Sequence, residues 1–256
     1  MKKTRIQYSI LLLILMVFVN CKGKQGDPGP AGSTSNGVIK GIVTLTRANG
    51  IQPGDMSGVV VKTDKGDSTV TNISGAWSLN EAAGIYVLTF SKAGYGTTTI
   101  NGYNFAGGGT SYINATALSQ APTYSTTVTL DTIGGSSTAT RDLHVNVNFA
   151  LTGTTPQMED RQVFVYYSTN SSLSASNYMG MVSVSIPATQ TSYKTTITGA
   201  DFLNAGIQSG QTIYAVAYPS AATMAMSSKY INETTGKTIY TSLAVGSVVE
   251  NYVVAH

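Results

Sequence analysis

The sequence contains little of what disulfides, metal sites and membrane-spanning helices require. Its 256 residues include 1 cysteine and 2 histidines, and 11% of the residues are charged. A single cysteine excludes an intrachain disulfide, and two histidines are few for a zinc site, which needs three or four converging ligands. The longest apolar run covers only residues 10–19. That run is too short to cross a bilayer core of about 30 Å as a helix.

The charge balance excludes a further class of partner. The chain has 15 basic and 12 acidic side chains, a formal net charge of +3. Three of the basic residues, Lys2, Lys3 and Arg5, lie in residues 1–20, which contain no acid. Without that segment, 12 basic and 12 acidic residues remain, and the net charge is zero. Nucleic-acid binding depends on clustered Lys and Arg. We therefore expect no nucleic-acid partner.

The first residues predict an exported protein. A basic start is followed by the apolar run 10–19, by Asn20 and by the single cysteine, Cys21. This order resembles the signal peptide and lipobox of bacterial lipoproteins, in which the cysteine is acylated and becomes the new N-terminus. Asn20 and Phe18 depart from the usual lipobox residues. The alternative is an ordinary secretory signal with an incidental cysteine, but such signals need small residues at A-x-A-like positions, which Phe18 and Asn20 do not provide.

The lipoprotein resemblance implies a signal peptide over residues 1–20 and an acylated Cys21 that holds the protein to membrane lipid, at the outer membrane. Residues 21–36 are rich in Gly, Pro and Ser and are interpreted as a flexible tether. Glycine recurs there at every third position, but a collagen triple helix needs many more triplets. In some lipoprotein systems acidic residues after the cysteine accompany surface export. Lys22 and Lys24 differ from that pattern and favour the periplasmic face.

From residue 37 the composition predicts an all-β fold. Short runs of β-branched and aromatic residues alternate with turn sequences rich in Gly, Asn and Ser. The strands expected up to residue 121 cover 38–46, 59–63, 69–71, 75–79, 85–90, 97–100 and 112–118. Within 85–90, Tyr86, Leu88 and Phe90 share one face at period two. This spacing predicts an antiparallel β-sandwich over residues 37–121.

Residues of this region resemble a known family. The resemblance rests on Thr69, Val70, Thr71, Gly75, Trp77, Leu79, Gly84, Tyr86, Leu88, Phe90, Lys92, Gly94 and Tyr95. They are similar to the carboxypeptidase regulatory-like, or transthyretin-like, domain. The resemblance implies a fold rather than an activity, because the zinc carboxypeptidases of that family bind the metal with a His-x-x-Glu pair and a second His. Here the third position after His144 is Val147, and His256 ends the sequence.

Residues 122–256 predict a second sandwich that begins at Pro122, since proline does not fit a central strand. The expected strands cover 126–130, 143–149, 163–167, 181–186, 193–197, 212–218 and 247–254, with one helical turn at 200–205. The segment 213–218 is similar to the penultimate strand of fibronectin type III-like domains. The Cys…Trp…Cys signature of immunoglobulin domains is absent, so the broad fibronectin type III or Ig-like class is expected. The fold prediction is all-β, with two tandem antiparallel β-sandwiches after the signal peptide and tether.

No residue pattern predicts catalysis. The chain has no Gly-x-Ser-x-Gly elbow, and no nucleophile is indicated for Asp142 and His144. Asp64 and Asp67 fit a turn, because a calcium loop needs about twelve residues and a closing Glu. We therefore expect no enzyme activity, no catalytic residue, no metal and no cofactor.

The 15 tyrosines provide the best candidates for binding residues. Tyrosine combines apolar area with a hydroxyl group and is enriched at interfaces, although it is also common in buried strands. The candidate partner contacts are Tyr103, Tyr112, Tyr178 and Tyr230. The leading hypothesis is a monomeric, non-enzymatic binding or scaffold protein of the cell envelope that presents sandwich loops to a protein or glycan partner. The alternatives are a glycan-binding accessory subunit of a polysaccharide uptake or degradation system and a hydrolase with an unrecognised site.

Overall fold

The structure is a computed structural model. It describes residues 35–122, 125–132, 143–150, 161–187, 189–190, 192–208, 210–220, 228–244, 246–247 and 249–253. The described residues belong to one compact unit that begins at Ser35. Cys21, the expected signal peptide and almost all of the tether lie outside the described residues. Acylation and export therefore stay predictions.

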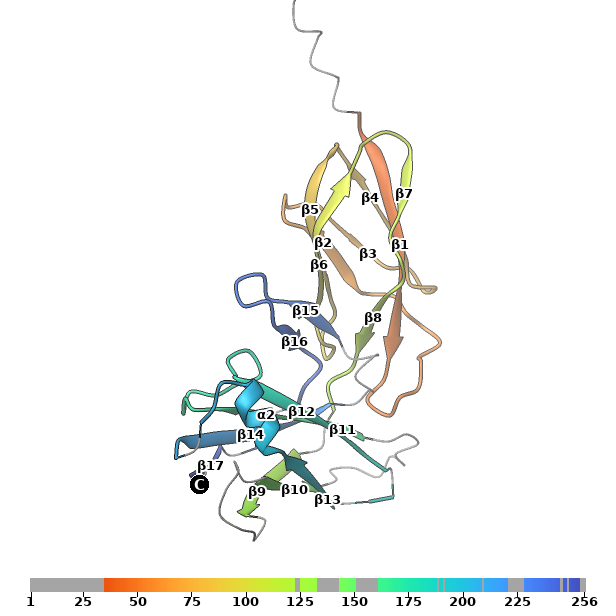
Figure 1. Cartoon of the computed structure of the whole chain (residues 1–256). Helices are drawn as coiled ribbons and strands as arrows, with labels where there is room; N and C mark the ends of the chain where they lie inside the picture. The colour runs from red at the N-terminus through yellow and green to blue at the C-terminus, as the bar shows by residue number, and fades with distance from the viewer. Residues whose placement is uncertain are drawn as a thin grey trace, which may run out of the picture. The chain divides into compact units, whose positions relative to one another are not determined.

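The chain is all-β, as predicted, and its strands β1 to β8 form an N-terminal sandwich of two sheets (Figure 1). One sheet contains β4 (Ala76–Glu81), β1 (Gly37–Thr46), β7 (Thr110–Tyr112) and β8 (Thr116–Ser119). The other sheet contains β3 (Ser68–Val70), β2 (Val60–Thr63), β5 (Gly84–Ser91) and β6 (Thr98–Phe105). The single strand expected over 112–118 is in fact two strands, β7 and β8, and both run parallel to β1.

The core of the N-terminal sandwich forms from the alternation that the sequence shows. Tyr86, Leu88 and Phe90 on β5 are buried together, as predicted. Trp77 and Leu79 on β4 join them from the opposite sheet, and the rings of Trp77 and Phe90 lie edge to face with centroids 5.6 Å apart. Edge-to-face contact is a favoured arrangement of two aromatic rings. Burial of alternate side chains on both sheets holds the sandwich together.

Gly75, one of the residues on which the family resemblance rests, occupies a position that only glycine fits. Its φ is +80°, a left-handed conformation that glycine adopts without steric cost. A Cβ at this position would lie 2.0 Å from the carbonyl oxygen of Val43. Any other residue would therefore be strained and would also collide with β1.

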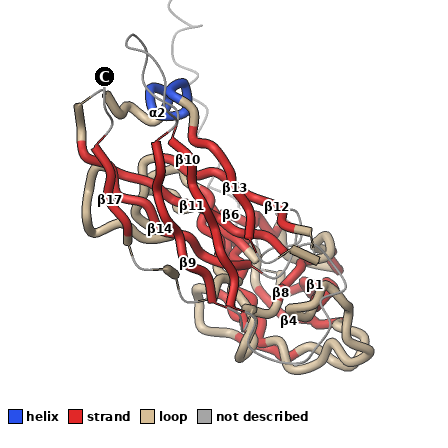
Figure 2. Tube along the Cα trace, turned by 90° about the horizontal axis from the view of Figure 1, so that it is seen from below, coloured by secondary structure: helices blue, strands red, loops and turns tan. Residues whose placement is uncertain are grey.

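Strands β9 to β14 and β17 form a C-terminal sandwich, and all of their pairings are antiparallel. One sheet contains β13 (Ser192–Ile197), β10 (Leu143–Ala150) and β9 (Ser125–Thr132). The other contains β12 (Gly180–Ile186), β11 (Arg161–Ser168), β14 (Thr212–Ser220) and β17 (Glu250–Val253). Figure 2 shows these strands running in similar directions. The expected helical turn is α2 (Gly199–Asn204), which begins at a capping box formed by Thr198 and Asp201.

Strand β11 is buried on both faces. Val163, Val165 and Tyr167 pack into the core between the two sheets of the C-terminal sandwich. Phe164 and Tyr166, which alternate with them, pack into a second cluster on the other face of the sheet. The alternation predicted for 163–167 is present, but neither face is open to solvent.

The second cluster is covered in part by a hairpin that the sequence did not predict, formed by β15 (Lys229–Ile231) and β16 (Thr238–Tyr240). The Tyr240 ring stacks on Phe164, with centroids 4.3 Å apart. The base of the hairpin contacts the N-terminal sandwich, where the Thr241 hydroxyl donates to the Thr97 carbonyl oxygen at 2.5 Å. The hairpin thus contacts both sandwiches. The predicted division at residues 121 and 122 stays a prediction.

Candidate binding groove

A groove of about 540 Å³ lies on the N-terminal sandwich. It is lined by Thr98, Ile100, Tyr103, Tyr112, Ile113, Asn114, Ala115, Thr116, Ala117 and Lys229. Nine of these residues come from β6 and from the stretch that runs from β7 into β8, and the tenth comes from β15. The volume is within the range of pockets that hold small ligands, about 300–1,000 Å³.

The groove forms where the two sheets of the sandwich end. Strand β6 is the outer strand of one sheet, and β7 and β8 lie at the side of β1 away from β4 in the other. Strand β7 ends at Tyr112 and β8 begins at Thr116, and this interruption leaves space between the edges of the two sheets. Ile113 still donates its N–H to the Lys40 carbonyl oxygen at 2.8 Å, whereas the side chains of Asn114 and Ala115 are exposed. This interruption therefore creates the groove at the edge of the sandwich.

Two of the candidate tyrosines meet in this groove. Tyr112 is the most exposed large hydrophobic residue of the described part, with 75% of its surface accessible. Tyr103 packs against the sandwich core, and its hydroxyl lies 2.7 Å from Ser111 Oγ. The Tyr103 side chain is thus fixed in place, and Tyr112 presents its ring to solvent beside it.

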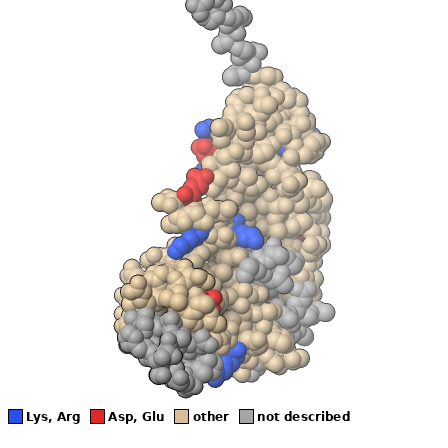
Figure 3. Space-filling view, viewed as in Figure 1, with Lys and Arg blue, Asp and Glu red and all other residues tan. Residues whose placement is uncertain are grey.

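The polar groups of the groove are almost all uncharged. The Thr98 hydroxyl donates to the Ala117 carbonyl oxygen at 3.2 Å, and Asn114 offers an exposed amide. The only lining residue with a formal charge is Lys229. Charged residues are also sparse beyond the groove: in Figure 3, Lys, Arg, Asp and Glu cover little of the face in view.

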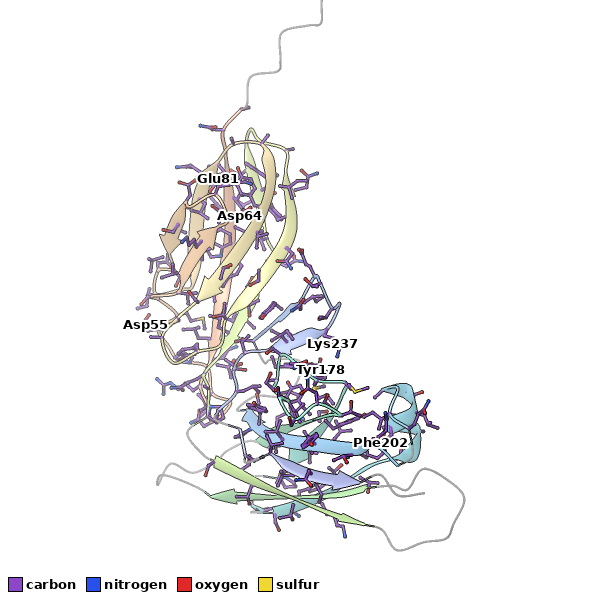
Figure 4. The ribbon with its side chains drawn as sticks, turned by 90° about the vertical axis from the view of Figure 1, so that its left-hand side faces the viewer. Asp55, Asp64, Glu81, Tyr178, Phe202 and Lys237 are labelled. Atoms are coloured by element: carbon purple, nitrogen blue, oxygen red, sulfur yellow. The ribbon has the colours of Figure 1, made fainter. Side chains whose placement is uncertain are left out.

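Tyr178 packs against the C-terminal sandwich and does not line the groove. Its hydroxyl donates to the Thr238 carbonyl oxygen at 3.0 Å, and its ring centroid is 4.8 Å from that of Tyr166. Lys237 places its Nζ 4.5 Å from the Tyr178 ring centroid and donates to the Tyr178 carbonyl oxygen (Figure 4). Burial raises the pKa of the Tyr178 hydroxyl. These contacts give Tyr178 the role of fixing the hairpin.

Tyr230 is half-buried on β15, where it pairs with Ile239, and it does not line the groove. The structure therefore brings Tyr103 and Tyr112 together but leaves Tyr178 and Tyr230 apart from them. Sequence reasoning missed Asn114 and Lys229. Asn114 could have been found from the polar break inside the expected strand 112–118. No local signal marks Lys229, because it reaches the groove from more than 100 residues along the chain.

Two other buried ionisable groups of the described residues have shifted pKa values. Burial and the charge of Asp201 raise the pKa of Tyr167 to about 12. Burial, followed by the charge of Asp67, raises the pKa of Glu81, whose Oε1 is buried without a hydrogen-bond partner (Figure 4). Within the described residues, no group of three or more His, Cys, Asp or Glu side chains is placed to hold a metal ion. No helix in that same part of the chain is long and apolar enough to cross a membrane.

A second hollow of about 400 Å³ lies at the turn between β2 and β3. Its lining consists of Lys62, Thr63, Asp64, Lys65, Gly66, Val87 and Thr89. It contains no aromatic side chain, and Lys65 forms an ion pair with Asp64 at 3.3 Å within it. The groove of Tyr103 and Tyr112 is therefore the stronger candidate for a ligand site.

The protein is thus all-β with two sandwiches, and the groove on the first of them is the candidate site. No protein-family model matches the chain, and no curated protein matches it. Similar solved structures include a DUF3823 family protein from Parabacteroides merdae, with 14% identity, a TM-score of 0.31 and coverage of 85% of this chain and 98% of that one. A DUF3823 family protein from Bacteroides ovatus has 11% identity, a TM-score of 0.29 and coverage of 86% and 99%.

A further similar structure is a protein of suggested carbohydrate-binding function from Bacteroides uniformis. It has 12% identity, a TM-score of 0.30 and coverage of 85% of this chain and 100% of that one. At these identities and TM-scores, the similarities assign neither a family nor a function. The function must be argued from the groove itself.

Proposed function

We propose that the protein is a non-enzymatic, lipid-anchored binding protein of the bacterial cell envelope, and that the groove of Tyr103 and Tyr112 binds a glycan. The observation that carries the proposal is the 75% exposure of Tyr112 beside Tyr103 in one lined groove. The lipid anchor at Cys21, the outer membrane and its periplasmic face are proposed from the sequence alone.

A sugar ring fits the chemistry of this groove. One face of a pyranose presents C–H groups that can lie against an aromatic ring, and its rim carries hydroxyl groups. Tyr112 offers such a ring, and tyrosine suits ligands that are apolar on one side and wet on the other. Thr98, Asn114 and Thr116 place hydroxyl and amide groups on the same lining. Such a combination of apolar surface with a few polar groups is typical of ligand sites.

The geometry favours a glycan over a protein partner. A stable protein–protein interface buries about 800 Å² on each side and usually has a central apolar patch. Tyr112 is instead exposed within a hollow of about 540 Å³ and is flanked by small residues such as Ala115 and Ala117. That size suits a few sugar units better than a broad protein surface.

The test is glycan binding by the detergent-solubilised protein and by Tyr112→Ala, measured on a glycan array and then by calorimetry. We expect saturable binding by the wild type and a loss of about tenfold or more in the variant, about 1.4 kcal/mol per tenfold. Tyr193→Ala is the matched control, because Tyr193 is 40% exposed on β13 and does not line the groove. Binding that survives Tyr112→Ala unchanged would contradict the proposed site.

The anchor is tested separately with Cys21→Ala. We expect the variant to leave the membrane fraction, and we expect the wild type to resist protease added to intact cells, as a protein on the periplasmic face should. Wild-type protein digested on intact cells would place it on the cell surface instead.

A further inference from the structure

Tyr112 belongs to two surfaces, because it lines the groove and also lies on the outer face of the sheet formed by β4, β1 and β7. The strand register pairs Tyr112 with Lys40 on β1. Ile39, the residue before Lys40, is buried in the core of the sandwich. Side chains alternate between the two faces of a strand, so Lys40 faces outward, as does the exposed Tyr112. The outer face of this sheet therefore begins at the rim of the groove.

A row of three side chains crosses this face. Lys40 lies between Ser78 on β4 and Tyr112 on β7. Neighbouring strands lie about 4.8 Å apart, so the row spans about 10 Å. In the adjacent row, Asn80 on β4 and Thr110 on β7 are both exposed. A surface with an aromatic ring on one side and polar groups across the rest is thus continuous with the groove.

The polar side chains of this face are not used by the fold. Ser78 and Asn80 are exposed, and within the described residues their side chains form no hydrogen bond. In the same part of the chain, the Lys40 ammonium group forms no ion pair or hydrogen bond. Ammonium, hydroxyl and amide groups can all donate hydrogen bonds to the oxygen atoms of a sugar. These three side chains are therefore available to a ligand.

The outer face of the other sheet of this sandwich differs. On β2, β3 and β5 it exposes Val60, Val70 and Ile85 and no aromatic ring, although it also carries a lysine, Lys62. Neither Lys62 nor these three apolar residues line the groove of Tyr112. The aromatic ring and the continuity with the groove therefore distinguish the face of Lys40, and Lys62 provides a matched control.

We infer that the glycan bound in the groove is a chain, and that it continues past Tyr112 across the row of Lys40 and Ser78. This inference rests on the proposed function and adds a second part of the site and the residues that bind there. Sugar units beyond the groove lie on the sheet face, where Lys40 and Ser78 donate hydrogen bonds to their oxygen atoms. A glycan fits this row better than a protein, because the row is polar at its centre, where a protein interface usually has an apolar patch.

The experiment uses the full-length protein in detergent and measures its affinity by calorimetry for ladders of xylo-, manno-, cello- and malto-oligosaccharides, each from the single sugar upward. The variants are Ser78→Ala and Lys40→Met, which keeps the apolar stem of the side chain and removes its charge. Lys62→Met is the matched control, because Lys62 is an exposed lysine on β2, in the other sheet. Thermal unfolding of each variant confirms that it is folded.

For the wild type we expect the affinity to rise with chain length, by about tenfold or more over a ladder that binds. Lys40→Met and Ser78→Ala should each weaken binding of the longer chains by about 3–10-fold, as the loss of one hydrogen bond does, and should leave binding of the shortest chain that binds unchanged. Lys62→Met should change neither. A general structural effect would instead weaken short and long chains alike.

Two results would overturn the inference and keep the proposed function. One is binding that depends on Tyr112 but does not strengthen with chain length. The other is equal binding of the longer chains by the wild type and by both Lys40→Met and Ser78→Ala. An absence of binding to every ladder and to every glycan of the array would overturn the inference and the proposed function together.

Discussion

Replacement of Ser228 by alanine tests the joint between the hairpin and the N-terminal sandwich. Ser119 and Ser228 are both fully buried, and the hydroxyl oxygen of each accepts a hydrogen bond from the backbone N–H of the other. Ser228 Oγ accepts from the Ser119 N–H at 2.8 Å, and Ser119 Oγ accepts from the Ser228 N–H at 3.0 Å. Ser228→Ala removes the acceptor of the first bond and leaves the Ser119 N–H buried and unpaired.

The expected cost follows from that unpaired donor. A buried polar group that loses its partner destabilises a protein by about 1–3 kcal/mol. In a chain of this size each kcal/mol lowers the melting temperature by about 2–4 °C. We therefore expect Ser228→Ala to lower the melting temperature by about 2–12 °C. Ser119→Ala should have a similar effect, because it leaves the Ser228 N–H unpaired.

The assay is thermal unfolding followed by circular dichroism, with urea unfolding as a second measure. Ser176→Ala is the control, because Ser176 is exposed and its hydroxyl lies 3.1 Å from that of Ser174, which is also on the surface loop. Exposed substitutions of this kind usually change stability by less than about 0.5 kcal/mol. If Ser228→Ala were no more destabilising than Ser176→Ala, the reciprocal serine pair would not be a structural joint.

Two further predictions concern the N-terminal sandwich. Gly75→Ala should destabilise it by at least about 2 kcal/mol in urea unfolding, because the new Cβ would be both strained and in collision with Val43. Gly94→Ala separates the two effects: its φ of +78° imposes the same strain, but no atom lies within 4 Å of the new Cβ, so equal losses would refute the collision. Glu81→Gln should stabilise the protein at pH 7 by about 1–2 kcal/mol. Burial raises the pKa of Glu81, so its folded form holds the proton more tightly than the unfolded chain, and the penalty grows as the pH rises above the unfolded value of about 4.3. The gain should therefore disappear in urea unfolding below about pH 4, and a gain independent of pH would contradict this origin.

The sequence predicted the strands well because strand formation depends on local properties. Tyr86, Leu88 and Phe90 alternate with smaller side chains, and this period places them on one face in any β-strand. Turn residues bounded most strands within a few positions, and even the short helix α2 was expected. Strands β15 and β16 were not predicted. Each has three residues, too short to show a clear period by itself, and β3, which is equally short, was expected next to the turn residues 64–67.

The candidate site was predicted only in part. Tyr103 and Tyr112 were selected and lie together in the groove, while Tyr178 and Tyr230 have other surroundings. The sequence alone could not distinguish an exposed tyrosine from a buried one. Tyr112 is 75% exposed and Tyr166 is fully buried, although both lie in β-strands, where side chains point alternately to opposite faces. The difference depends on which elements pack against each strand face.

The sequence by itself determined the all-β class, the alternation that builds the core and the uncharged character of residues 93–130. Only the tertiary structure decided that the strand expected over 112–118 breaks to open a groove and that Lys229 lies beside it. The physical reason is the separation along the sequence over which each effect acts. Propensity and periodicity act over a few residues, whereas the Ser119–Ser228 contact joins positions 109 residues apart and depends on the packing of the whole chain.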